Sequence, residues 1–193
     1  MDIKNYHGAD ILPYLDDLAR LRITVFRDFP YLYDGDLDYE RNYLATYARS
    51  PRSLFVLAMD DGNIVGASTG LPLSDAEADF QRPFREAGID INDVFYFGES
   101  VLLPDYRGHG IGHRFFDERE KFAKDQGFSI TAFCAVERPA DHTARPQDYR
   151  PLDEFWQSRG YQRQDDLVTT YRWKDIGDEA ESEKNMLFWL RGL

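Results

Sequence analysis

The chain has 193 residues, of which 42% are hydrophobic, and this length suffices for one domain with a sizeable core. Its net charge of −12 repels a nucleic-acid backbone and attracts cationic partners. The sole cysteine, Cys134, excludes an intrachain disulfide and a Cys-cluster metal site. No apolar run reaches the length of a membrane span, and the first ten residues lack a signal-peptide pattern. We therefore expect a cytoplasmic protein with no nucleic-acid or membrane partner.

Apolar spacing and turn residues predict strands and helices in one continuous α/β domain over residues 1–193, without an internal repeat. The clearest local signal is a hairpin that turns at Asp60 to Asn63, and Ser74 and Asp75 are candidate caps of the helix after it. The predicted elements are a strand at 2–8, helices at 8–26 and 37–50, the hairpin at 53–73, a helix at 74–89, a strand at 93–104, a helix at 111–126, a strand at 128–136, a loop at 137–150, a short helix at 151–160, and strands at 167–173 and 185–190.

A glycine-rich segment, PDYRGHGIGHR at 104–114, joins a predicted strand to a predicted helix. Gly108, Gly110 and Gly112 let main-chain N–H groups turn toward a ligand, and the helix N-terminus adds partial positive charge, so the expected ligand is a phosphate. The spacing fits neither the dinucleotide fingerprint G-x-G-x-x-G nor the ATP-type loop, which needs Gly-Lys-Ser/Thr. From Arg107 the segment reads R-x-x-G-x-G instead, and an ordinary strand-to-helix turn is the alternative.

This motif resembles the acyl-CoA pyrophosphate loop of the GNAT superfamily of N-acetyltransferases. The stretch FGESVLLPDYRGHGIGHRFF is similar to that family's fourth strand, loop and third helix, and FWQSRGY stands where the family has a short helix of the form F-Y-x-x-x-G-F. The resemblance implies an α/β (α+β) fold, in which helices flank a mixed, mostly antiparallel central sheet. It also implies that the fourth and fifth strands splay apart around the pantetheine arm of acetyl-CoA.

The same resemblance implies the residues that bind acetyl-CoA as co-substrate, with no metal. The main chain of Ser100, Val101 and Leu102 would bind the pantetheine amides. The main chain of the loop would bind the pyrophosphate through Gly108, His109, Gly110, Ile111, Gly112 and His113. The guanidinium of Arg107 either contacts phosphate or lies in solvent, and the two histidines are expected at the rim of the site rather than as bases.

Glu99 is the candidate general base, because an amine with a pKa of roughly 10 must lose a proton before it attacks a thioester. Many members of the family carry a glutamate at this place; the alternative is a strand carboxylate that faces solvent or pairs with a basic side chain. Trp156 replaces the family's usual tyrosine acid, which leaves Tyr149 as the candidate acid or as a packing aromatic. Cys134 is expected to be an inert buried thiol.

The segment DFPYLYDGDLDYE at 28–40 interleaves carboxylates with aromatic rings, which suits a cation, although a solvated acidic helix face is the alternative. The resemblance implies that this segment walls the acceptor site. We therefore expect an N-acetyltransferase that moves acetyl from acetyl-CoA to a primary amine of a small molecule or peptide by direct attack in a ternary complex. Transfer of another acyl group and a CoA-binding sensor with little catalysis are the alternatives, and a homodimer is compatible with each.

Overall fold

The computed structural model describes all 193 residues, and a seven-stranded sheet in the order β1-β2-β3-β4-β5-β7-β6 forms its centre. Neighbouring strands are antiparallel, except β4 and β5, which are parallel. The expected mixed, mostly antiparallel sheet is therefore confirmed. The strands are β1 (Asp2–His7), β2 (Leu54–Asp60), β3 (Asn63–Pro72), β4 (Val94–Leu102), β5 (Ile130–Val136), β6 (Gln162–Trp173) and β7 (Ser182–Gly192).

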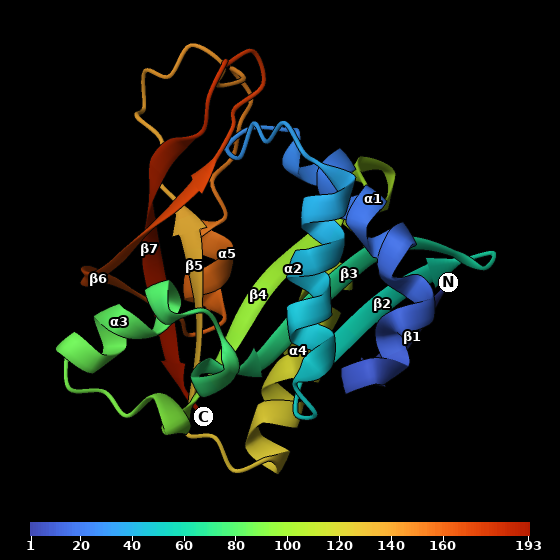
Figure 1. The fold of residues 1–193 in the computed structure, drawn as a ribbon, viewed down its shortest axis with the longest axis vertical. Helices are drawn as coiled ribbons and strands as arrows, with labels where there is room; N and C mark the ends of the chain where they lie inside the picture. The colour runs from blue at the N-terminus through green and yellow to red at the C-terminus, as the bar shows by residue number, and fades with distance from the viewer.

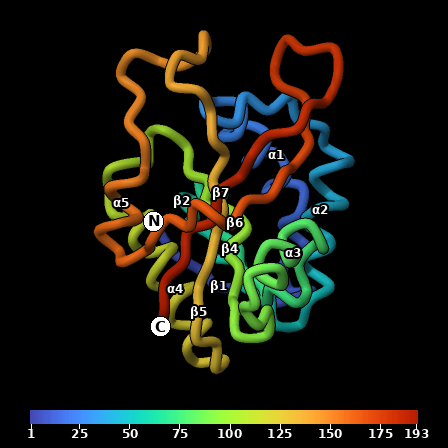
Figure 2. Tube along the Cα trace, turned by 90° about the vertical axis from the view of Figure 1, so that its left-hand side faces the viewer, coloured from blue at the N-terminus to red at the C-terminus, as the bar shows by residue number.

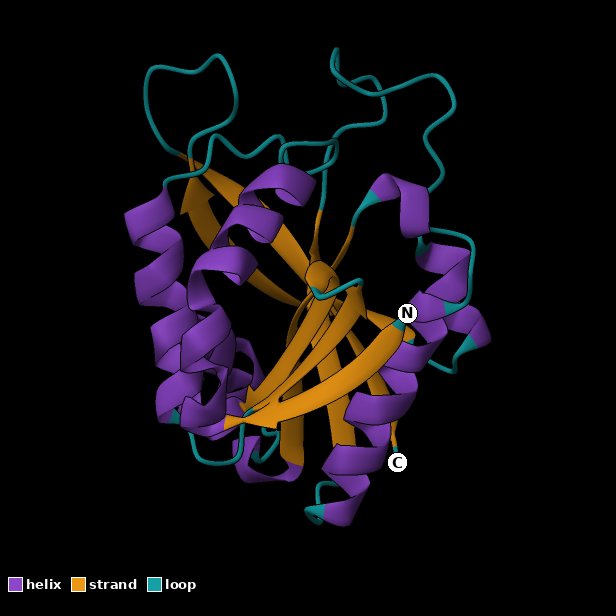
Figure 3. Cartoon of the chain, turned by 90° about the vertical axis from the view of Figure 1, so that its right-hand side faces the viewer, coloured by secondary structure: helices purple, strands orange, loops and turns teal.

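Helices cover both faces of the sheet, as Figures 1 and 3 show. The helices are α1 (Leu15–Phe26), α2 (Leu37–Arg49), α3 (Ala78–Glu86), α4 (Ile111–Asp125) and α5 (Asp153–Ser158). One buried apolar cluster joins α1, α2 and α3 to their face of the sheet, and a second joins α4 to the opposite face. Each large side chain buried in these clusters stabilises the fold by about 1.5–3 kcal/mol. None of the helices is long and apolar enough to cross a membrane.

The parallel strands β4 and β5 pair over three residues only, with Val94 to Tyr96 opposite Ile130 to Ala132. Beyond this point they diverge, and the gap widens toward their carboxyl ends (Figure 1), which confirms the expected splay. Figure 2 shows that the loops at 27–36, 137–152 and 174–181 gather at this same end of the molecule. Segments far apart in the sequence therefore meet where the sheet opens.

The predicted starts of the first helix and of the helix after the hairpin were wrong. The helix predicted from residue 74 begins at Ala78, because Ser74 and Asp75 lie in a short 3-10 turn and do not cap it. The carboxylate of Asp75 accepts a hydrogen bond from Ser50 Oγ at 2.6 Å instead. The helix predicted from residue 8 begins with a 3-10 turn, Gly8–Tyr14, and becomes α-helical at Leu15.

Candidate active site

A β-bulge in β4 decides which way Glu99 faces. Ser100 is opposite Ser68 and Phe97 is opposite Gly70, so two residues of β4, Gly98 and Glu99, share the place opposite a single residue of β3. Phe97 belongs to the apolar cluster on the α4 face, and strict alternation would send Glu99 to that face as well. The extra residue turns the Glu99 carboxylate toward α1 and α2.

Glu99 belongs to a buried charge cluster. Its Oε2 atom lies 2.7 Å from Nη1 of Arg22, although no donor reaches this oxygen with good hydrogen-bonding geometry. Arg22 also contacts the carboxylate of Glu40 from α2, and all three side chains are buried. Burial opposes the charged form of Arg22, but the charges of Glu99 and Glu40 outweigh it and hold its pKa well above the ordinary value. Two carboxylates share one guanidinium, so Glu99 is ion-paired and its role as base stays a prediction.

The glycine loop has the conformation that a backbone anion site requires. Gly108 and Gly110 adopt φ angles of +79° and +81°, in the left-handed region that favours glycine. Gly110 caps α4, and the first helical hydrogen bond runs from Arg114 N to the Gly110 carbonyl, so the N–H groups of Ile111, Gly112 and His113 have no helical acceptor. A Cβ at Gly108 or Gly110 would meet no protein atom within 4 Å, which leaves space for a ligand against the backbone. These residues fit a pyrophosphate group.

The side chains of this loop lie outside that cradle. Arg107 donates from Nε to the Leu102 carbonyl at 3.1 Å and lies 3.9 Å from the carboxylate of Asp28, with half of its side chain exposed. His109 is exposed, whereas the His113 ring packs edge-on against Phe155. The fold does not bring the two histidines into one cluster with Glu99, and Arg107 is directed toward the end of β4.

The strand segment before the loop offers donors to the gap. Leu103 N–H donates to the Val65 carbonyl of β3, and N–H groups along a strand alternate between its two edges. The N–H groups of Ser100 and Leu102 therefore point away from β3, toward the gap between β4 and β5, whereas Val101 is buried and pairs with β3. Two of the three predicted pantetheine contacts thus have a free N–H on the correct edge.

The remaining predicted groups occupy different parts of the site. Tyr149 packs edge-on against Phe29, with ring centres 4.7 Å apart, and burial raises the pKa of its hydroxyl. Trp156 packs against Phe133 and Trp189 on the α4 side. By its contacts Tyr149 is therefore a packing aromatic, and the role of Tyr149 as general acid stays a prediction.

Cys134 lies buried on β5, and desolvation raises the pKa of its thiol to about 12. The Tyr96 hydroxyl lies 3.2 Å from the sulfur. A thiol with so high a pKa is protonated near neutral pH and is a poor nucleophile. The expected burial of the thiol is confirmed, and its inertness stays a prediction.

Tyr31 is a residue of the site to which the sequence assigned no role of its own. Burial raises the pKa of its hydroxyl, and the nearby groups that also act on this pKa are Cys134, Arg22, Tyr149 and Glu99. These four residues come from β5, α1, the 137–152 loop and β4, so the hydroxyl lies near residues of both splayed strands. Local pattern could not reveal it, because the loop that carries Tyr31 acquires this position only from tertiary packing.

An aromatic pocket of about 80 Å³ adjoins the charge cluster. Tyr96 and Gly98 of β4 form its floor beside the gap, and α1, α2, the loop between them, β6 and β7 contribute the walls. A Cβ at Gly98 would clash with the Tyr47 hydroxyl at 2.4 Å, so only glycine fits there. The lining residues are Arg22, Phe26, Tyr31, Tyr33, Tyr39, Glu40, Tyr43, Phe80, Tyr96, Gly98, Tyr171, Trp173 and Met186.

The acidic and aromatic segment at 28–40 contributes unequally to this pocket. Its three tyrosines line the pocket, but Glu40 is its only carboxylate that does so. Asp36 caps α2, Asp38 pairs with Arg41 and Asp34 pairs with Lys174 on the surface. The segment is therefore a pocket wall on one side and a solvated acidic face on the other.

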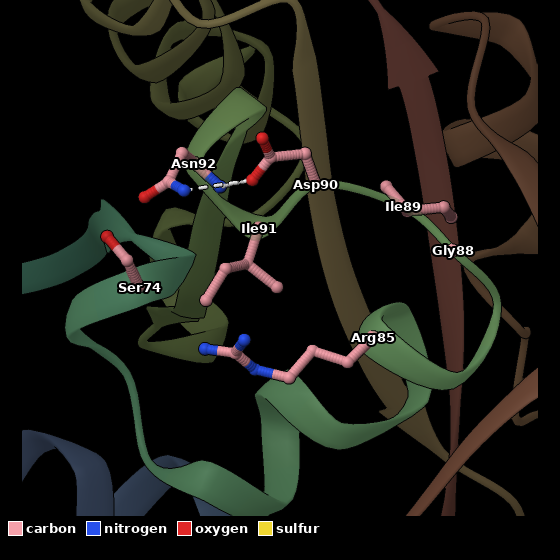
Figure 4. A pocket seen from close by; sticks show the side chains of 7 residues that line it. All are labelled: Ser74, Arg85, Gly88, Ile89, Asp90, Ile91 and Asn92. Atoms are coloured by element: carbon pink, nitrogen blue, oxygen red, sulfur yellow. Dashed lines mark hydrogen bonds between the residues drawn. The ribbon is translucent and has the colours of Figure 1, made fainter.

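A second hollow, of about 450 Å³, lies on the surface between α3 and the start of β4 (Figure 4). Asp90 caps a 3-10 turn there, because its carboxylate accepts hydrogen bonds from the main-chain N–H and the side-chain amide of Asn92. Its lining offers only one basic and one acidic side chain, Arg85 and Asp90. We assign no chemistry to it.

Comparisons with known proteins agree with this geometry. The sequence model of the acetyltransferase (GNAT) family matches residues 18–146, so the chain belongs to this family, whose members transfer an acetyl group from acetyl-CoA. No curated protein matches the chain in sequence.

Similar solved structures share the fold over nearly the whole chain. The ribosomal-protein-alanine N-acetyltransferase of Brucella melitensis has a TM-score of 0.63 at 15% identity and covers 98% of this chain and 99% of its own. An N-acetyltransferase of Staphylococcus aureus Mu50 has a TM-score of 0.62 at 12% identity, with 100% and 99% covered. The PaiA N-acetyltransferase of Thermoplasma acidophilum, solved in complex with coenzyme A, has a TM-score of 0.59 at 14% identity, with 100% of both chains covered. At these identities the likeness shows the fold alone.

Proposed function

We propose that the protein transfers acetyl from acetyl-CoA to an unbranched primary alkylamine, by direct attack within a ternary complex. The observation that carries this proposal is the aromatic pocket, whose floor residue Gly98 is next to Glu99 in the β4 bulge. The amine pocket and the strand edge that binds the thioester arm thereby share one short stretch of chain. No metal is required for this reaction.

The main chain holds the co-substrate in this proposal. The loop from Gly108 to His113 binds the pyrophosphate, and the N–H groups of Ser100 and Leu102 bind along the pantetheine arm. Acetyl-CoA supplies a thioester carbon that an amine can attack. Ser100 N–H is the candidate donor to the thioester oxygen, where negative charge develops.

The pocket selects the acceptor by size and charge. Its volume of about 80 Å³ is about half of the roughly 150 Å³ of an apolar cavity that binds benzene, so a narrow alkyl chain fits it better than an aryl group. A methylene chain that ends in an ammonium group fits, because aromatic faces attract cations. The charge cluster of Arg22, Glu40 and Glu99 carries a net negative charge beside it. Glu77, an exposed carboxylate near Tyr171, adds to this negative field.

Proton transfer follows from the same arrangement. Glu99 takes the proton of the amine, directly or through water, and the amine then attacks as a neutral nucleophile. The thiol that leaves has a pKa of about 8.5, so it departs as a thiolate near neutral pH even where no strong acid assists. The hydroxyls of Tyr31 and Tyr149 lie close enough to act on each other's charge, and Tyr149 remains the candidate acid.

A panel of amines at saturating acetyl-CoA tests the proposal, with free thiol as the readout. We expect kcat/KM to be highest for butylamine and pentylamine, and at least 10-fold lower for benzylamine and for branched tert-butylamine, because one misfit methylene in a pocket costs roughly 1–3 kcal/mol. Propionyl-CoA and succinyl-CoA in place of acetyl-CoA test the alternative acyl groups. Binding of acetyl-CoA without turnover of any amine would favour the sensor, and equal rates for butylamine and benzylamine would overturn the assigned acceptor.

A further inference from the structure

Arg119 of α4 is a buried guanidinium that has no carboxylate partner. It is 1% exposed and forms no ion pair. Its Nε donates to the Phe115 carbonyl at 3.1 Å, and its Nη2 donates to Ser100 Oγ at 2.8 Å. Its Nη1 donates to the carbonyls of Thr69 and Glu99, at 3.3 and 3.0 Å. The hydrogen bonds of the guanidinium therefore all go to neutral oxygens, on β3, on β4 and on α4 itself.

An unpaired buried charge is costly, and a fold keeps one only where other interactions or a function offset the cost. Part of the offset is local, because the guanidinium lies 4.1 Å from the ring centre of Phe97 and 4.9 Å from that of Phe116. The remaining cost is visible in its pKa, which desolvation lowers to about 10. A methionine or leucine would avoid this cost, but it would leave the carbonyls of Thr69 and Glu99 without their donor.

The contacts of Arg119 fall on the bulge in β4. Thr69 is the residue of β3 that faces the two bulge residues, Gly98 and Glu99, and its carbonyl and that of Glu99 lie where the ladder between the two strands is interrupted. Nη1 donates to both carbonyls and so replaces the missing ladder donor. Arg119 therefore keeps the bulge in the one shape that turns Glu99 toward the amine pocket.

The Glu99 carbonyl and the Ser100 N–H belong to the same peptide group, and they point in opposite directions across a planar trans bond. Arg119 holds the carbonyl end from the β3 side, so the N–H end points into the gap between β4 and β5. A donor on the carbonyl polarises the whole peptide and strengthens its N–H as a donor, by roughly 10–30% per bond. The buried positive charge adds to the potential that stabilises negative charge in the gap.

We propose that Arg119 is a positioning residue for acyl transfer, which fixes the Glu99–Ser100 peptide and makes the Ser100 N–H a stronger donor to the thioester oxygen. This inference rests on the proposed function for its kinetic consequence. The geometric part, the fixed and polarised peptide, stands independently of the acceptor. The two parts can therefore fail separately.

The variants that test it are Arg119→Gln, which removes the charge, and Arg119→Lys, which keeps the charge but has fewer donors. Arg191→Gln is the control, because Arg191 of β7 pairs with Glu120, the neighbour of Arg119 in α4, and makes no hydrogen bond to the bulge. We expect Arg119→Gln to lower kcat on the order of 10-fold, less than the 10²–10³-fold cost of losing a whole oxyanion donor. Arg119→Lys should recover part of this loss. The KM for the amine and the dissociation constant of CoA should hardly change.

Two further readouts separate this role from a purely structural one. The amide proton resonance of Ser100 should move upfield in both Arg119 variants and stay in place in Arg191→Gln, whether or not an active amine has been found. The pH profile of kcat should keep its midpoint, because Arg119 itself does not titrate near neutral pH. If Arg119→Gln does not fold, Arg119→Lys and its Ser100 resonance decide. An unmoved resonance, or folded variants with the kcat of the wild type, would overturn the proposal.

Discussion

The buried charge cluster contains two carboxylates, of Glu99 and Glu40, and only one guanidinium, that of Arg22. Removal of one carboxylate leaves a neutral pair, Arg22 with the other glutamate, rather than an isolated buried charge. Glu99 can therefore lose its charge without the large penalty that usually follows when a buried pair is broken. A substitution of Glu99 can therefore test its role in proton transfer without a large loss of stability.

Glu99→Gln is nearly isosteric and should report on proton acceptance. If Glu99 is the base, kcat falls by a factor on the order of 10² to 10⁴, while acetyl-CoA affinity hardly changes, because main-chain groups of β4 bind the co-substrate. The defect should shrink as pH rises, since more of the amine then arrives deprotonated. Turnover of the best amine, measured from neutral to alkaline pH, checks this.

Asp38→Asn is the matched control, because it removes one exposed carboxylate of α2 that pairs only with Arg41. An exposed pair of this kind contributes about 0–1 kcal/mol. Its kcat should equal that of the wild type. A Glu99→Gln variant with unchanged kcat but a lowered melting temperature would assign Glu99 a structural role and leave water or Glu40 as the proton acceptor.

At the scale of elements, the loop before α4 shows what a local motif can predict. The glycines after Arg107 predicted a loop that turns main-chain N–H groups toward a ligand at the start of a helix, and Gly108 and Gly110 indeed adopt positive φ angles before α4, because backbone conformation there depends mainly on neighbouring residues. Strand β6 shows the opposite case. Its first five residues, Gln162 to Asp166, are polar and were not predicted, because an edge strand has no second neighbour and no apolar pattern to show.

Tertiary contacts account for the other features that the sequence could not predict. Arg119 lies in the charged stretch DEREK and looks like an exposed helix residue, yet it is buried. The aromatic pocket combines Tyr31, Tyr171 and Trp173, which lie up to 142 positions apart in the chain, with Trp173 Nε1 donating to the Tyr31 carbonyl. No periodicity brings such residues together. Glu99 could be singled out, but its pairing with Arg22 could not.

Gly110→Asp tests the loop as an anion-binding element. The substitution places a Cβ and a negative charge beside the N–H groups at the start of α4, in a conformation that costs an ordinary residue roughly 1–2 kcal/mol. Acetyl-CoA binding should fall at least 100-fold by calorimetry, while the variant still folds. Gly62→Asp is the control, because Gly62 has the same φ of +81° and no atom near its Cβ position, but lies in the β2–β3 turn. Equal affinity in both variants would make the glycine loop a turn only.

At the scale of the whole molecule, one arginine ties together the loops that surround the open end of the sheet. Arg138 belongs to the 137–152 loop and donates to the carbonyls of Pro30 and Tyr31, at 2.8 and 2.9 Å. It also forms a two-point ion pair with Asp175 of the 174–181 loop. These three loops thereby place Tyr31 and Trp173 in the pocket wall. The net charge of −12 adds a long-range field that favours a cationic acceptor.

The most direct test of the account follows the acetyl group itself. The purified protein is incubated with butylamine and with acetyl-CoA that carries an isotope label in its acetyl group, and the products are separated and counted. We expect labelled N-acetylbutylamine and free CoA in equal amounts, with neither formed in the absence of the amine. Free CoA without labelled amide, or no release of CoA with any primary alkylamine, would contradict it.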